Sequence, residues 1–110
     1  MILDAAIPIA SETITNILQG ASRAVSARIA SKGDGMLQDG MFTWFQRDDS
    51  RVVFRVQNAN NHQITYGVLS AALTGMQTYM LHVGYGGVQF RLYDGKNQVG
   101  QGTLGYQLGA

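Results

Sequence analysis

The chain has 110 residues, a formal net charge of +1 and only 14% charged residues. This length predicts one domain with a core of its own, since domains cluster at roughly 100–150 residues. The absence of cysteine excludes disulfide scaffolds, cysteine-ligated metals and thiol catalysis, and the near-neutral charge disfavours a dedicated nucleic-acid-binding protein.

Residues 1–32 are predicted to form an N-terminal amphipathic helix, with Pro8 in its first turn and residues 2–7 as an extended lead-in. Apolar residues recur here at spacings of three and four, the period of a helix with one buried face. The stripe includes Ile7, Ile14, Ile17, Leu18, Ala21 and Val25. Its favoured interpretation is core packing against a sheet. The alternative is a detachable helix that enters a membrane or packs against a protein partner.

A hairpin is predicted next, after a glycine-rich loop at 33–40 within the same domain. Its strands are residues 41–46 and 51–57, and residues 47–50 form the turn. Alternate residues of the second strand are apolar, and the others are Arg51, Val53, Arg55 and Gln57. This alternation is typical of a sheet with one buried face and one wet face.

A second helix is predicted over residues 64–83, with Asn60 or Asn61 as its N-cap. Its inner stripe is expected to be centred on Val68, Met76 and their neighbours at helical spacing. Apart from His82 the segment has no charged residue, so we expect it to be covered on more than one side. We therefore predict self-association of the chain, with a symmetric dimer as the commonest form.

A second hairpin follows, with strands at residues 88–93 and 98–104. Arg91 and Tyr93 fall on its outer face by parity. The predicted fold is a single α+β domain over residues 1–110, with the order α-ββ-α-ββ and an antiparallel sheet of about four strands packed by two helices. Residues 41–104 form its ββαββ body. The predicted core is Ile14, Ile17, Val52, Phe54, Val56, Val68, Leu73, Met76, Phe90 and Leu92.

No catalytic, metal or cofactor site is expected. The run 84–87 is rich in glycine but follows a helix instead of preceding one, so it predicts a helix end and not a phosphate cradle. His62 and His82 lie at opposite ends of a helix about 30 Å long, too far apart to share a metal. The adjacent Asp48 and Asp49 are typical of a turn, and no G-x-S-x-G motif is present.

The candidate binding surface is the wet face of the sheet, with Arg51, Arg55, Arg91 and Tyr93. Arginines with an aromatic neighbour can hold an anionic ligand or a single-stranded nucleic acid by charge and stacking. The simpler interpretation is that arginines are ordinary residues for a solvated sheet face. If the face binds, Arg55→Glu is expected to abolish binding and leave the fold intact.

Two resemblances extend these expectations. Residues 60–69 (NNHQITYGVL) and the segments YDG at 93–95 and QVGQG at 98–102 resemble small, mostly uncharacterised fungal proteins, which implies a fungal source and export but no catalytic residue. An amphipathic helix before a β-rich body is similar to the layout of actinoporin-type pore formers, which implies a membrane-active protein.

The leading functional hypothesis is a non-enzymatic binding or interaction module that acts through surface contacts. A membrane-active protein and a binder of anionic ligands or nucleic acid are its alternatives. No apolar run reaches the roughly 18 residues of a plain membrane-spanning helix. The start of the chain lacks the basic segment of a secretory signal, so we expect a cytoplasmic protein or one secreted after processing.

Overall fold

The computed structural model describes residues 2–8, 11–45, 52–60, 62–83 and 86–106. The helices are α1 (Ser11–Lys32) and α2 (Tyr66–Val83), with a short 3₁₀ helix η1 (Gln38–Gly40) between them. The strands are β1 (Ile2–Pro8), β2 (Met41–Phe45), β3 (Val52–Asn58), β4 (Gly86–Asp94) and β5 (Asn97–Tyr106). The predicted α+β class, with two helices and an antiparallel sheet, is confirmed.

The sheet has five strands in the order β1-β4-β5-β3-β2, and every neighbouring pair is antiparallel. The four predicted strands are all present. The fifth comes from the N-terminal segment, which was expected only as an extended lead-in to a helix. Strand β1 pairs with β4 and forms one edge of the sheet, and β2 forms the other edge.

The start of the first helix was predicted wrongly. Pro8 is the last residue of β1, opposite Gly86, and α1 begins at Ser11 instead of near Pro8. Ile7, predicted on the helix stripe, is therefore a strand residue. An edge strand accepts proline because a missing N–H on its outer side removes no ladder hydrogen bond.

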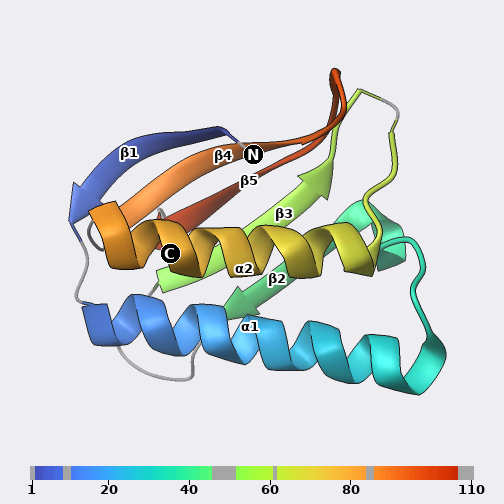
Figure 1. Ribbon diagram of the computed structural model, residues 1–110, viewed down its shortest axis with the longest axis horizontal. Coiled ribbons are helices and arrows are strands. Elements are labelled where there is room, and N and C mark those ends of the chain that lie inside the picture. Colours follow the sequence, from blue (N-terminus) through green and yellow to red (C-terminus); the bar gives the residue numbers. More distant parts are fainter. Residues whose placement is uncertain (1, 9–10, 46–51, 61, 84–85, 107–110) are drawn as a thin grey trace.

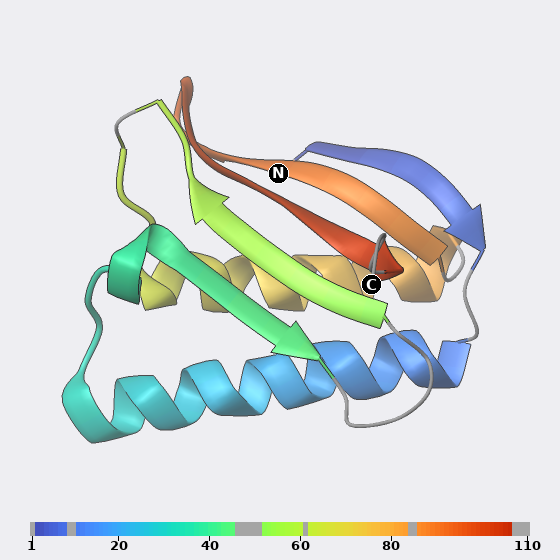
Figure 2. The same cartoon turned by 180° about the vertical axis from the view of Figure 1, so that it is seen from behind.

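Both helices lie on the same face of the sheet and run side by side, so the molecule has two layers (Figure 1; Figure 2). The predicted stripe of α1 faces inward, and five of its members are fully buried: Ile14, Ile17, Leu18, Ala21 and Val25. The Gln77 amide donates to the Ser22 hydroxyl across the two helices at 2.9 Å. The guanidinium of Arg28 lies 4.7 Å from the centre of the Tyr66 ring, which joins the end of α1 to the start of α2.

The core lies between the helix layer and the sheet. Phe54 is fully buried at its centre, stacked on Phe90 at 5.7 Å between ring centres and in edge contact with Phe42 at 6.2 Å. Nine of the predicted core residues are buried: Ile14, Ile17, Val52, Phe54, Val56, Leu73, Met76, Phe90 and Leu92. The prediction that Val68 belongs to the core is wrong, because this residue is 36% exposed.

The second helix differs from its prediction in both start and inner face. It begins at Tyr66, and its buried side is centred on Leu69, Leu73, Met76 and Met80, one helical step away from Val68. Of the two asparagines predicted to cap it, Asn60 sits instead in a turn with a φ of 55° and donates to the Gln98 carbonyl. Asn61 lies outside the described residues.

Two other residues cap this helix. The Thr65 hydroxyl accepts a hydrogen bond from the Val68 N–H at 3.2 Å, within the first turn. The Asp34 carboxylate, from the loop after α1, accepts from the N–H groups of Gly35 and Gly67, both at 2.8 Å. A carboxylate at this end is also favoured by the helix dipole. The loop between α1 and β2 therefore fixes where α2 starts.

Candidate functional site

The face of the sheet opposite the helices carries polar side chains at its centre. In β3 the residues that alternate with the buried Val52, Phe54 and Val56 are Val53, Arg55 and Gln57, as predicted from parity. The strand order extends this set to the neighbouring strands. On β3, β5 and β4, the three central strands, the exposed polar residues of the face are Arg55 and Gln57, Gln101 and Thr103, and Gln89 and Arg91 respectively.

The register arranges these six side chains in two rows across the three central strands. In one row Arg55 lies opposite Thr103, and Thr103 lies opposite Gln89. In the other row Gln57 lies opposite Gln101, and Gln101 lies opposite Arg91. Each row therefore ends in one arginine and one glutamine, and the two arginines stand at diagonally opposite corners.

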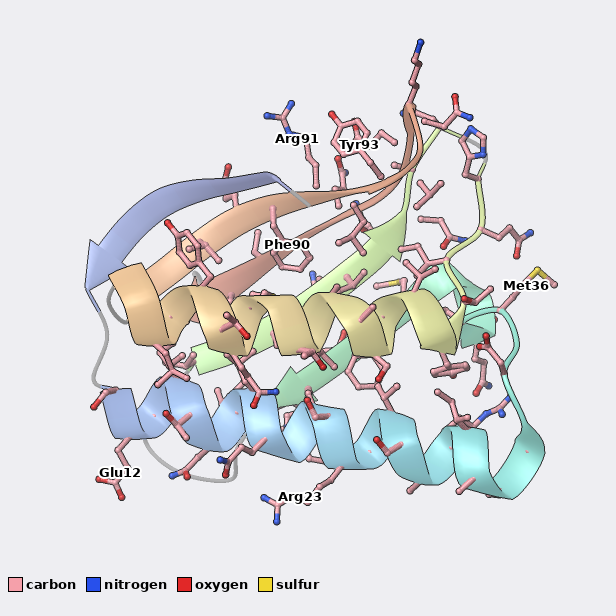
Figure 3. The ribbon with its side chains drawn as sticks, viewed as in Figure 1. Glu12, Arg23, Met36, Phe90, Arg91 and Tyr93 are labelled. Atoms are coloured by element: carbon pink, nitrogen blue, oxygen red, sulfur yellow. The ribbon has the colours of Figure 1, made fainter. Side chains whose placement is uncertain are left out.

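Together these side chains line a hollow of about 590 Å³, with Phe90 and Gly102 completing the lining. The Cα atoms of Arg55 and Arg91 are two strand spacings and two residues apart, which corresponds to about 12 Å. Both side chains are exposed and long enough to reach a group placed over β5 between them. Figure 3 shows Arg91 pointing away from the helix layer, while its neighbour Phe90 points toward it.

Tyr93 was predicted on the same surface, but it is not part of this lining. The ladder between β4 and β5 shifts register between Leu92 and Tyr93, and Tyr93 lies beyond this bulge, opposite Gln98 and half-buried. The unpaired residue of this bulge is Val99 of β5, so β4 keeps its alternation and Tyr93 stays on the same side of the sheet as Arg91 (Figure 3). Tyr93 nevertheless lies outside the lining, and the hollow is flanked by cations and amides.

Of the predicted arginines, the structure brings together Arg55 and Arg91. Arg51 lies outside the described residues, and so do Asp48 and Asp49. Sequence reasoning missed Gln101 and Thr103, which sit between the two arginines. Their signal was the alternation of polar residues with glycine and leucine along 101–104. This alternation assigns Gln101 and Thr103 to the site only when β5 is known to lie between β3 and β4.

The candidate membrane or partner helix is α1, and a contact with lipid or another chain would need its apolar stripe at the surface. The stripe of α1 that would touch lipid or another chain is the side buried against α2 and the sheet. Within the described residues no helix is both long and apolar enough to cross a membrane. The solvent side of α2 is more apolar than that of α1, with Val68 and the 72% exposed Leu81.

The part of the chain that the structure describes contains no cluster of potential metal ligands. No three His, Cys, Asp or Glu side chains there gather closely enough to hold a metal ion. His62 is exposed, and its backbone N–H bonds to the Ala59 carbonyl in a turn. The His82 side chain and residues 84–85 of the glycine run lie outside what the structure describes.

No family model, no curated protein and no solved structure matches the chain. The resemblance of residues 60–69, 93–95 and 98–102 to fungal proteins stays a prediction.

Proposed function

We propose that the protein is a non-enzymatic binding module, and that the open face of its sheet holds a small anionic ligand. The observation that carries the proposal is the placement of Arg55 and Arg91 at opposite corners of a polar hollow. Two guanidinium groups can each give charge-assisted, two-pronged hydrogen bonds to a phosphate, sulfate or carboxylate. Such bonds are roughly twice as strong as those between neutral groups.

The groups between the arginines support a ligand with polar parts as well as charge. Gln57, Gln89 and Gln101 each offer both a donor and an acceptor, and Thr103 adds a hydroxyl. A volume of about 590 Å³ lies within the range of small-molecule sites, roughly 300–1,000 Å³. This hollow is open and polar, which fits a hydrophilic ligand better than an apolar one.

A single-stranded nucleic acid is the less supported ligand of the same face. Binding without sequence preference depends on aromatic side chains on which bases stack, together with a basic groove. Tyr93 is the aromatic residue predicted for that role, and it does not line the hollow. The membrane-active alternative would require α1 to release its buried stripe, so it is also less supported than binding at the open face.

The test is calorimetric titration of the full chain with inorganic tripolyphosphate as the probe. Arg55→Glu and Arg91→Glu are each expected to weaken binding about tenfold or more, because each removes charge-assisted bonds and adds repulsion. The matched control is Arg23→Glu, which makes the same charge change at an exposed arginine on α1. Circular dichroism of each variant checks that the fold is kept.

Three results would contradict the proposal or change its ligand. Equal weakening by Arg23→Glu would mean that only net charge matters. Unchanged binding by Arg55→Glu would remove the open face as the site. An oligothymidine could bind more tightly than tripolyphosphate and lose that binding in Arg55→Glu. This result would mean that the ligand of the open face is a single-stranded nucleic acid instead of a small anion.

A further inference from the structure

The two edges of the sheet differ in how they are protected from pairing with another strand. Exposed edges invite such pairing, and proteins commonly block them with charges, proline or bulges. The β1 edge has all three devices: Asp4 and Pro8 in its sequence, and a register shift between Ala5 and Pro8. The β2 edge has none, since Met41–Phe45 reads MFTWF and its register with β3 continues without a shift.

The unprotected edge also exposes large apolar side chains. Met41 is 43% exposed and Phe45 is 61% exposed, while Thr43 between them is also exposed. All three alternate with Phe42 and Trp44, which are half-buried and pack against the core. An uncharged, apolar edge strand is the kind of surface that needs a partner in water.

The sequence of β2 is complementary to itself when two copies run antiparallel. With the twofold axis at Thr43, Met41 of one copy lies opposite Phe45 of the other on one face of the new sheet. On the other face Phe42 lies opposite Trp44. Thr43 meets its own copy at the axis. Apolar, aromatic and threonine pairs of this kind stabilise antiparallel ladders, and no like charges face each other within the five pairs.

We propose that β2 pairs with β2 of a second copy of this chain, which joins the two sheets into one continuous ten-stranded sheet. The contact is a closed twofold interface, because the same strand serves both copies and leaves only the two protected β1 edges. A second copy fits better than an unrelated peptide, since the apolar and aromatic positions match under this one symmetry. Two polar hollows would then lie on one continuous face, five strand spacings or about 24 Å apart.

The sharpest test uses the absence of cysteine from the natural chain. In Thr43→Cys the two new thiols would lie opposite each other at the axis, where antiparallel Cα atoms are about 4.5–5.5 Å apart. That spacing is within the range of a disulfide, about 4.4–6.8 Å. Mild oxidation is expected to give nearly complete covalent dimer on a non-reducing gel. Peptide mass is expected to show that the disulfide joins the substituted position of one copy to the same position of the other.

Two matched controls locate the contact. Thr103→Cys places the thiol at the centre of the open face, and Thr74→Cys places it on the exposed side of α2. Both are expected to stay at least tenfold less cross-linked under the same conditions. Faster cross-linking at Thr74→Cys than at Thr43→Cys would overturn the proposal and make α2 the interface.

Sedimentation equilibrium gives an independent readout. The wild type is expected near twice its 11.9 kDa mass at micromolar concentrations. Thr43→Glu is expected to be monomeric with an unchanged circular dichroism spectrum. It would put like charges opposite each other at the axis, while its own neighbour across the ladder is Arg55. A wild-type monomer at millimolar concentration would overturn the proposal, and so would a Thr43→Glu dimer or a series of species larger than a dimer.

Discussion

The two faces of the sheet are formed by the same strands but differ in the burial and polarity of their side chains. On the helix side of β3, Phe54 is fully buried and stacked on Phe90, and its neighbours along that face are also buried. On the other side of the same strand, Arg55 and Gln57 are exposed and line an open hollow. Burial of the apolar side chains on the helix side stabilises the fold. The polar side chains on the open side already contact water in the folded state, so they contribute little to stability.

This difference means that substitutions one residue apart should affect different properties. A change on the covered face removes packing that the whole molecule shares. A change on the open face alters charge and hydrogen-bonding groups in contact with water, and such surface changes usually stay within about 0.5 kcal/mol. Stability and binding can therefore be separated by choosing which face to substitute, and the following predictions do so from the largest effect to the smallest.

The adjacent pair Phe54 and Arg55 should show the greatest contrast. We expect Phe54→Ala to lower the free energy of unfolding by about 3–5 kcal/mol, because it leaves a cavity beside Phe42 and Phe90. Arg55→Ala should change it by less than about 0.5 kcal/mol. Urea titration followed by circular dichroism measures both, and a comparable loss in the two variants would contradict the division between the faces.

Two glycines of β5 give a similar contrast within one strand. A Cβ at Gly102 would collide with the carbonyl oxygen of Arg55 and the ring of Phe90, so Gly102→Ala should cost about 1–3 kcal/mol. A Cβ at Gly105 meets nothing within 4 Å, and Gly105→Ala should be neutral or slightly stabilising. The measurement is the midpoint of thermal unfolding, and equal midpoints for the two variants would show that the contact at Gly102 relaxes freely.

A smaller effect is expected at the start of α2. Asp34→Ala removes the acceptor for the N–H groups of Gly35 and Gly67 and should cost about 1 kcal/mol in the free energy of unfolding. Asp34→Asn keeps an acceptor oxygen but loses the charge, so it should recover part of that cost. If asparagine and alanine destabilise equally in urea, a neutral acceptor does not replace the carboxylate, and the expected recovery by Asp34→Asn is contradicted.

The covered face could be predicted well from the sequence because its signal is periodic. Spacings of three and four in α1 and of two in β3 identified residues such as Ile17 and Phe54 as core, and both are fully buried. The errors arose where a second signal competed. Pro8 is compatible with a first helical turn and with an edge strand, and only the pairing of β1 with β4 distinguishes them. Val68 lay on a helical stripe that was drawn one step too far around α2.

The open face could be predicted only one strand at a time. Parity assigned Arg55 and Arg91 to outer faces of their own hairpins, but it cannot show that β5 lies between those strands. The position of Gln101 and Thr103 between the arginines depends on that strand order. Nor can parity show that Tyr93, two residues beyond Arg91, lies outside the lining of the hollow. The sequence therefore predicted some residues of the site but not their arrangement in space.

The division of the sheet into a stabilising face and a binding face is tested most directly by mapping the ligand on the protein. Amide chemical shifts of the full chain are recorded during titration with inorganic tripolyphosphate. We expect the largest shifts at Arg55, Gln57, Gln89, Arg91, Gln101 and Thr103, while amides along α1 stay unchanged. Shifts gathered on the helix layer, or spread evenly over exposed basic residues such as Arg23 and Lys32, would contradict this division.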